Sequence, residues 1–296
     1  MVKRKPDWLK KSILMSNDAS RLLSVLKTHH LATVCEEAFC PNRCECFSGK
    51  RLTFMILGSI CTRSCAFCGV GKGAPEPVDP DEPQRLAEAA AALNLRHAVV
   101  TSVTRDDLSD GGAAHFVRVT AALRSLKHPV IVELLVPDFR GDWSAVTAVA
   151  RSGADIINHN LETVPRLYPR IRPQADYGRS LRLLERAVAA APSTAVKSGL
   201  MVGLGENRRE IFRVLSDLRH AGCAMITIGQ YLPPTRSHLP AVEYVSPDVF
   251  EEYASRARSL GFESVACGPF VRSSYGAEAS YQRMADTRIT QPPVFP

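Results

Sequence analysis

The chain has 296 residues, of which 45% are hydrophobic and 23% are charged, and these values are ordinary for a soluble globular protein. It contains no run of about 18 apolar residues, and its basic start lacks the apolar core and cleavage site of a secretory signal. The net charge is +7, but the sequence contains no stripe of Lys and Arg with interleaved aromatic residues. This argues against nucleic-acid binding. We therefore expect a cytoplasmic protein that binds neither membranes nor nucleic acids.

Nine cysteines, six of them in two tight groups, are the first notable feature in chain order. The odd count fits metal sites in a reducing compartment better than a disulfide framework. The first trio has the spacing C-x4-C-x5-C and consists of Cys35, Cys40 and Cys46. The second trio has the spacing C-x3-C-x2-C and consists of Cys61, Cys65 and Cys68. Three thiolates from one short loop are typical ligands of an iron–sulfur cluster. Since a four-iron cluster then keeps one iron without a cysteine, that iron can bind a substrate or cofactor.

From Leu52 onward, short apolar runs alternate with amphipathic segments. The predicted strands are Leu52–Leu57, Ala98–Thr101, Val130–Val136, Asp155–Asn158, Val196–Val202 and Met225–Ile228. The predicted helices are Pro83–Leu93, Ala113–Leu126, Asp142–Ser152, Gly178–Ala191, Arg208–Ala221 and Pro247–Leu260. Near-continuous apolar strands that alternate with helices predict a parallel sheet covered by helices.

Six strand–helix units in series favour an α/β fold built as a partial (β/α)6 TIM-type barrel over a doubly wound sheet. Periodicity alone does not decide between the two, but polar residues cluster just after the strand ends, where barrels place their active sites. We expect three parts in the chain. Residues 1–50 form an N-terminal extension with the first trio, residues 51–266 form the barrel, and residues 267–296 form a C-terminal extension, and the two extensions cover the barrel.

The second trio directly follows the first predicted strand, so its thiolates should face the mouth of the barrel. Its C-x3-C-x2-C spacing resembles the signature of the radical S-adenosylmethionine superfamily, and Phe67 resembles the aromatic residue usual there. The resemblance implies that the open iron binds the amino and carboxylate groups of S-adenosylmethionine, whose cleavage gives a 5′-deoxyadenosyl radical. Structural zinc is the alternative, but it needs a fourth ligand, and His97 is too distant in sequence to be an obvious one.

The residues around the first trio, TVCEEAFCPN from Thr33 to Asn42, resemble the auxiliary-cluster motif of the lipoyl synthase family within that superfamily. The likeness continues through nearly the whole chain, in segments 102–112, 132–139, 158–168, 197–206 and 229–232. It ends with Arg272-Ser-Ser-Tyr275, which is similar to the closing motif of the family. The resemblance implies that Ser274 ligates the open iron of the auxiliary cluster. Without it, a simple turn would be the better interpretation of these serines.

Three positions depart from the family's pattern. Cys44 lies inside the first trio where a small residue is usual, and it is either a neutral filler, which we favour, or an alternative ligand. Thr104 replaces an acidic residue before Arg105, and Gln174 stands where glycine is common. We expect neither Thr104 nor Gln174 to touch a cluster ligand.

Polar residues within the predicted strands are candidate cofactor contacts. Glu133 is a carboxylate in an apolar run, where burial without a partner is costly, so it should face a cation or the ribose hydroxyls of the cofactor. Asn158 and Lys197 could reach the cofactor or the auxiliary cluster's pocket. A structural role at the barrel mouth is the equal alternative for all three. His159 is expected to alternate outward on its strand.

The resemblance implies a sulfurtransferase with two [4Fe–4S] clusters and S-adenosyl-L-methionine as cofactors. Its substrate would be an octanoyl chain in amide linkage to a lysine of a lipoyl carrier domain. Two sulfur atoms from the auxiliary cluster would be inserted at carbons 6 and 8, with two S-adenosylmethionine molecules consumed.

The same resemblance implies three kinds of partner. These are the octanoylated lipoyl domain of a 2-oxoacid dehydrogenase E2 subunit or the glycine cleavage H protein, an electron donor such as ferredoxin or flavodoxin, and an iron–sulfur assembly or carrier protein. Two other functions stay open. A radical enzyme of the same fold could modify another substrate, for example by methylthiolation, and an electron carrier would need fully ligated clusters, against which the open second trio argues.

Overall fold

The computed structural model describes residues 5–11 and 16–290. Its main sheet has eight strands, and neighbours pair in parallel except at the β1 edge, where β1 is antiparallel to β2. In spatial order the strands are β1 (Ala32–Thr33), β2 (Thr53–Ile56), β5 (His97–Ser102), β6 (Ile131–Leu135), β7 (Ile156–Asn158), β8 (Ala195–Val202), β9 (Met225–Gln230) and β10 (Ser264–Gly268). Within the described residues the ladder ends at β1 and β10, so the strands form an open, partial barrel.

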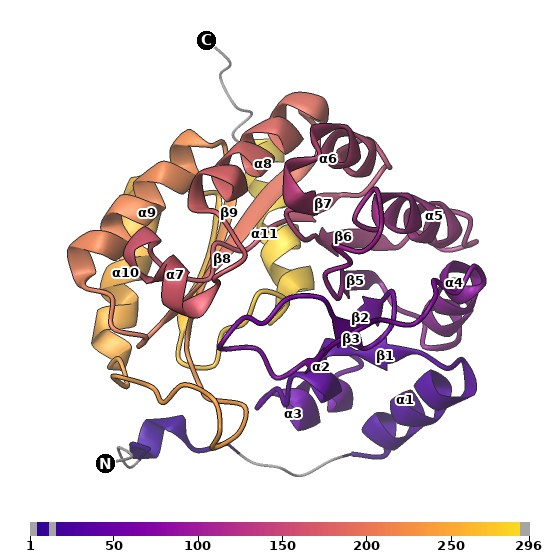
Figure 1. Cartoon of the computed structure of the whole chain (residues 1–296), viewed down its shortest axis with the longest axis horizontal. Coiled ribbons are helices and arrows are strands. Elements are labelled where there is room, and N and C mark those ends of the chain that lie inside the picture. The colour runs from indigo at the N-terminus through magenta and orange to yellow at the C-terminus, as the bar shows by residue number, and fades with distance from the viewer. Residues whose placement is uncertain (1–4, 12–15, 291–296) are drawn as a thin grey trace.

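Six helices connect successive parallel strands and form an arc outside the sheet (Figure 1). They are α4 (Glu82–Ala92), α5 (Ala113–Arg124), α6 (Trp143–Ala150), α8 (Tyr177–Ala190), α9 (Arg208–His220) and α10 (Pro247–Ser259). Local sequence fixes where several of them begin. The Asp142 side chain caps α6, and Asn207 and Glu210 form a capping box at the start of α9.

These elements confirm the predicted α/β fold and its six strand–helix units. The seventh parallel strand, β10, was not predicted, and it spans the expected boundary between residues 266 and 267. The first 50 residues add elements that the sequence patterns did not reveal. They are a short 3₁₀ turn (Asp7–Leu9), α1 (Asn17–Thr28), α2 (Val34–Glu37) and α3 (Arg43–Ser48).

The two ends of the barrel differ. The C-terminal helix α11 (Ala277–Thr290) packs Tyr281 and Met284 against Ile156, Ala195 and Met225, which lie at the amino ends of β7, β8 and β9. Helix α11 therefore covers the amino-end side of these strands (Figure 1). Helix α11 does not cover the carboxyl ends of these strands, which is where barrels of this kind place their active sites. None of the helices in the described part of the chain has the length and apolarity needed to cross a membrane.

Candidate active site

The carboxyl ends of the strands surround a cavity of about 340 Å³, within the usual size range of ligand pockets. Five of the six predicted cysteine ligands line it, namely Cys35, Cys40, Cys61, Cys65 and Cys68. Cys46 does not line the cavity but lies within electrostatic range of Cys35 and Cys40. Ser274 is part of the same lining, so Cys35 and Ser274, which are 239 positions apart in the sequence, meet here.

The loop of the second trio begins at a small parallel ladder between β3 (Ile60–Cys61) and β4 (Gly71–Lys72). The Cys61 sulfur accepts hydrogen bonds from the backbone N–H groups of Arg63 and Thr104, each at 3.4 Å. The expectation that Thr104 touches no cluster ligand is therefore wrong, because a backbone contact does not depend on the side chain that the family pattern records. Gln174 contacts no cysteine, but its side chain accepts from the backbone N–H of Ser64 at 2.8 Å.

Arg63 anchors the second trio to the barrel. Its guanidinium donates to Asp106 at 2.7 and 2.8 Å and to Asp138 at 2.6 Å. Asp138 is fully buried and also accepts from the side chain of Arg179 at 3.2 Å. Burial works against ionisation of Asp138, but the hydrogen bond and charge of Arg63 hold its pKa below the ordinary value. The loop between Cys61 and Cys65 is thus fixed to the end of β6 by a buried ion pair.

The first trio is held between the two ends of the chain. Asn42 is buried and donates from its side-chain amide to the Phe270 carbonyl at 2.7 Å, while its side-chain oxygen accepts from Lys11 at 2.6 Å. Glu45 pairs with Lys11 at 2.6 Å and accepts from the Tyr275 hydroxyl at 2.8 Å. Residues near the start and end of the chain therefore clamp the loop that supplies Cys40 and Cys46.

Ser274 reaches the first trio through Thr53 at the start of β2. The Thr53 hydroxyl donates to the Ser274 hydroxyl oxygen at 2.8 Å, and Thr53 lies beside Cys35, where it acts against the burial that raises the pKa of that thiol. Both Ser273 and Ser274 line the cavity, but this shared contact places Ser274 beside a trio cysteine. That position suits a fourth, oxygen ligand.

The thiols of Cys35, Cys46 and Cys68 are set in surroundings that oppose their ionisation. Burial, aided by the nearby Cys40 thiol, raises the pKa of Cys35 to about 12, and burial raises the pKa values of Cys46 and Cys68 to about 11. Such thiols lose their protons when a metal binds them. Among the described residues no three His, Cys, Asp or Glu side chains are arranged to hold a single metal ion. A single zinc ion needs thiolates about 2.3 Å from one point, whereas thiolates around a cluster bind separate irons.

The predicted cofactor contacts Glu133, Asn158 and Lys197 lie inside the barrel and do not belong to the cavity lining. One Glu133 oxygen accepts from Lys197 Nζ at 2.7 Å and from the Asn158 side chain at 3.1 Å. The other oxygen lies 3.3 Å from His97 Nε2 without hydrogen-bond geometry. Burial opposes ionisation of Glu133, yet Lys197 and His97 lower its pKa to about 2. Each residue thus has a structural partner, and contact with the cofactor stays a prediction that no observed position supports.

His159 lies one residue beyond the end of β7 and also lines the cavity, so the expected alternation along a strand does not describe its position. It turns toward the covering helix α8, where its Nε2 lies 3.0 Å from the Ser180 hydroxyl, and its Nδ1 lies 2.8 Å from the Val136 carbonyl. Burial lowers the pKa of His159 to about 4, so the ring is neutral at physiological pH. The neutral ring then donates to Val136 and accepts from Ser180.

Sequence patterns missed Arg172 of the cavity, whereas its neighbour Asn160 is one of the polar residues that follow the predicted strand Asp155–Asn158. Arg172 Nη1 donates to the carbonyls of Asn160 and Leu161 at 2.9 and 3.1 Å. Its Nε, and Oδ1 of Asn160, are buried without a hydrogen-bond partner in the described part of the chain. Gly199 makes room beside them, because a Cβ there would lie 2.6 Å from Asn160 Oδ1. Buried donors and acceptors without partners beside the second trio fit a polar, charged ligand such as S-adenosylmethionine.

Comparison with protein families supports this geometry. The model of the radical SAM superfamily matches residues 55–218, which include the second trio. A lipoyl synthase of Alkaliphilus metalliredigens is 51% identical over 282 residues, which cover 95% of this chain and 97% of that protein. A lipoyl synthase of Caldanaerobacter subterraneus subsp. tengcongensis is 54% identical over 278 residues, covering 94% of this chain and 97% of that protein.

Solved structures show the same fold at much lower identity. Methylornithine synthase matches with a TM-score of 0.56 at 14% identity, covering 85% of this chain and 72% of that one. Coproporphyrinogen III oxidase from Escherichia coli matches with a TM-score of 0.51 at 15% identity, covering 70% of this chain and 52% of that one. These solved structures support the fold, and the two lipoyl synthases described above identify the family. The chain belongs to the lipoyl synthase family of the radical SAM superfamily.

Proposed function

We propose that this enzyme inserts two sulfur atoms, at carbons 6 and 8, into an octanoyl group held in amide linkage to a lysine of a lipoyl carrier domain. The observation that supports this most strongly is the single cavity lined by cysteines of both trios and by Ser274. A radical generated at the cluster of the second trio would lie in the same cavity as the sulfur of the first trio's cluster. Neither acid–base nor ordinary nucleophilic chemistry breaks the unactivated C–H bonds of such a chain.

The residues present fit two clusters and one molecule of S-adenosylmethionine at a time. Cys61, Cys65 and Cys68 would hold the cluster that binds S-adenosylmethionine, with Arg172 and Asn160 as polar contacts for the cofactor. When bound, these groups supply one-electron cleavage of the cofactor and hence a carbon-centred radical that can abstract hydrogen. The chain's own task is to hold the cofactor, orient the substrate and keep water away.

The first trio and Ser274 would hold the second, auxiliary cluster, whose role is to supply sulfur. A serine oxygen is a harder ligand than a thiolate and is more readily displaced from iron. Thr53 donates to the Ser274 oxygen and so positions that oxygen next to Cys35. Cys44 lies two residues from Cys46 on α3 and does not line the cavity, in keeping with a filler role.

The cavity wall also fits the substrate chain. Much of the lining is apolar and includes Val34, Phe67, Leu135, Met201 and Val271. An octanoyl group buried against these side chains gains about 0.8 kcal/mol for each CH₂ removed from water. The same side chains exclude water from the reacting carbons, which protects a reactive radical from side reactions.

The rim of the cavity offers a contact for the carrier domain. Phe39, between Ala38 and Cys40, is 59% exposed and lines the cavity, so an aromatic ring stands at the opening. Exposed aromatic side chains are typical of protein contact surfaces. The proposal therefore includes an octanoylated E2 lipoyl domain or H protein as partner. It further includes a ferredoxin or flavodoxin as electron donor, an iron–sulfur carrier protein and a cytoplasmic location.

One anaerobic reaction tests this proposal. Reconstituted enzyme, dithionite, S-adenosylmethionine and an octanoyl-lysyl carrier peptide are combined, and mass spectrometry follows both the peptide and 5′-deoxyadenosine. The expected result is a peptide that gains two sulfurs while two deoxyadenosines form. Deoxyadenosine without sulfur gain would leave radical chemistry in place but contradict the proposed substrate.

A further inference from the structure

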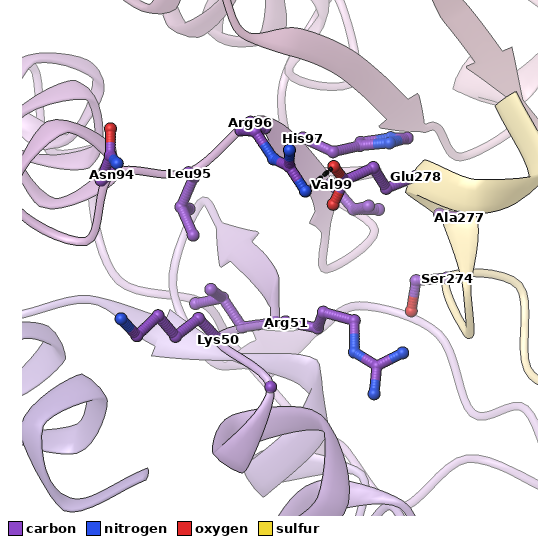
Figure 2. Close-up of a pocket in the computed structure, with 12 residues that line it drawn as sticks. Lys50, Arg51, Asn94, Leu95, Arg96, His97, Val99, Ser274, Ala277 and Glu278 are labelled. Carbon is purple, nitrogen blue, oxygen red and sulfur yellow. Dashed lines mark ion pairs between the residues drawn. The ribbon is translucent and has the colours of Figure 1, made fainter. Parts of the chain in front are cut away.

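A second, smaller cavity lies on another side of Ser274 (Figure 2). It has a volume of about 190 Å³ and is formed by the residues after α3, the chain before β5 and the first turn of α11. The charged and hydroxyl side chains of its lining belong to Lys50, Arg51, Arg96, Ser274 and Glu278. Ser274 lines both this cavity and the active-site cavity, so it stands in the wall between them.

The small cavity is positively charged. Lys50, Arg51 and Arg96 contribute three positive charges to its lining and Glu278 one negative charge, and Lys50 is itself paired with Asp18 at 3.6 Å. Arg96 is paired with Glu278 at 2.8 Å, whereas Arg51 is only loosely paired, 3.8 Å from Glu45. In Figure 2 the Arg51 side chain extends toward the side of the cavity on which Ser274 lies, and Lys50 extends the other way. Arg51 is thus the cation best placed to attract an anion toward Ser274.

The helix at the cavity wall adds to this field. The first turn of α11, a helix of 14 residues, includes Ala277 and Glu278, and both line the cavity. The amino end of a helix has a partial positive charge and free N–H groups, which favour anions. Basic side chains, a helix amino end and the Ser274 hydroxyl therefore surround the same space.

The active-site cavity is less suited than the small cavity to a free small anion. Much of its lining is apolar, which penalises an anion that leaves water. Of the arginines that also line it, Arg63 is held by Asp106 and Asp138, and Arg172 and Arg272 donate to backbone carbonyls. During turnover it would also hold S-adenosylmethionine and the acyl chain. An auxiliary cluster that gives up sulfur must regain it before the next product forms, and the small cavity reaches Ser274 from another side.

We propose that the basic cavity is a second entrance to the auxiliary-cluster site, and that it binds a small sulfur anion, hydrosulfide, on its way to the iron ligated by Ser274. This inference rests on the proposed function, because it assumes that the cluster is consumed and that Ser274 is its displaceable ligand. Arg51 attracts the anion and Arg96 lines its path. The substrate enters and leaves only through the other cavity.

The test compares enzyme loaded with both clusters, as wild type, Arg51→Gln, Arg51→Lys and Arg209→Gln. Arg209 is exposed on α9 and lines neither cavity, so Arg209→Gln is a control for the same loss of charge. One round of product formation is measured first. Ferrous iron and sodium sulfide are then added to the spent enzyme, and recovery of iron and acid-labile sulfide per chain is followed in time at low and high salt.

The first round should be the same in all four proteins, since each begins with an intact cluster. Recovery should be about tenfold slower in Arg51→Gln at low salt, because loss of steering by a charged side chain lowers association rates by this order. Arg51→Lys and Arg209→Gln should recover at the wild-type rate. Added salt should slow the wild type toward the Arg51→Gln rate, because salt screens the attraction.

Recovery of Arg51→Gln at the wild-type rate would overturn the second entrance while leaving the proposed function intact. A wild type that forms no product in the first round would instead contradict the proposed function. Should Arg51→Gln load too little cluster at the start, Arg96→Gln decides the matter, because Arg96 is 80% exposed and its side chain pairs with Glu278, not with the first trio. Unchanged recovery in Arg96→Gln would then overturn the inference.

Discussion

The two cysteine trios face one cavity but are held by different parts of the chain. The second trio is fixed by Arg63, which the barrel residues Asp138 and Asp106 bind through three hydrogen bonds. The first trio is fixed by contacts between chain ends, including Asn42 with Phe270 and Glu45 with Tyr275. The ligands of the second trio therefore take their positions when the barrel folds, whereas those of the first need both ends of the chain to dock.

This difference matches the roles proposed for the two sites. A cluster that works as a reusable reagent is best held by a rigid core. A cluster that is consumed and rebuilt is better served by ligands on segments that can loosen without unfolding the barrel. The contacts of the first trio are mostly single hydrogen bonds and partly exposed ion pairs, which contribute about 1 kcal/mol each.

Removing one ligand from each trio should separate the two functions most strongly. We expect Cys65→Ala to abolish formation of 5′-deoxyadenosine, because the cofactor would lose its cluster. Cys40→Ala should abolish sulfur insertion while some cofactor cleavage continues. Chromatography of deoxyadenosine and mass spectrometry of the peptide measure both. Lipoyl product from Cys40→Ala would show that the first trio is not the source of sulfur.

Replacement of the oxygen ligand should act on the first trio alone. Ser274→Ala should assemble both clusters, as judged by iron and acid-labile sulfide, and yet form no product. Ser273→Ala is the matched control, since Ser273 lines the same cavity whereas the Thr53 hydroxyl donates to Ser274. Normal turnover by Ser274→Ala would rule out a displaceable serine ligand.

Breaking the anchor of the second trio should destabilise the whole barrel. Asp138→Asn removes the buried charge that faces Arg63 and Arg179, and loss of one partner of a buried pair costs about 3 kcal/mol. Urea unfolding measures this change. Asp106→Asn, at a side chain that is 26% exposed, should cost clearly less. An equal loss of unfolding free energy in the two variants would mean that burial does not make Asp138 the stronger partner of Arg63.

Acid should weaken the barrel interior only at low pH. The pKa of Glu133 is about 2 in the folded protein against 4.5 ordinarily, so its ion pair contributes fully above pH 4.5 and is lost as the pH falls toward about 2. The difference in unfolding free energy between wild type and Glu133→Gln should stay constant from neutral pH down to about 4.5 and shrink below it. Urea unfolding of cluster-free protein, which avoids acid loss of the clusters, measures it. A difference that does not vary with pH would contradict the pairing with Lys197.

The smallest effect should come from loss of the hydrogen bond between Tyr275 and Glu45. Tyr275→Phe removes the hydroxyl that donates to Glu45, at a cost of about 1 kcal/mol. We expect a faster loss of iron from the first trio than from the second, followed by Mössbauer spectroscopy of each cluster. Equal loss from both sites would show that the two trios are not held independently.

Most of the barrel could be predicted from the sequence, and the cysteines of both predicted trios do meet at one cavity. Apolar runs such as Val196–Val202 become buried parallel strands because both faces of the sheet are covered. The cysteine trios were recognisable because their members lie close together in the chain, and their role as cluster ligands stays a prediction. β10 was missed because its sequence, Ser264–Gly268, ends in small residues and most of it is only partly buried.

Contacts that join distant segments could not be predicted in the same way. Glu133 was predicted to face a cation or the ribose of the cofactor, and the cation is Lys197, two strands away in the sheet, which the sequence did not single out as its partner. Arg172 gave no local signal, since its place at the cavity depends on the packing of α7 (Tyr168–Ile171) and the loop after β7. The position of Ser274 beside Cys35 came only from family resemblance and needed the fold to explain it.

The central claim is that the enzyme's own cluster sulfide, assigned above to the first trio, is the source of the inserted sulfur. The most direct measurement uses enzyme whose clusters have been rebuilt with ³⁴S-labelled sulfide, freed of excess sulfide, and given S-adenosylmethionine, dithionite and an octanoyl-lysyl carrier peptide. Mass spectrometry of one round of product should find both inserted sulfurs as ³⁴S. Product with unlabelled sulfur, or deoxyadenosine with no sulfur in the peptide, would contradict the account.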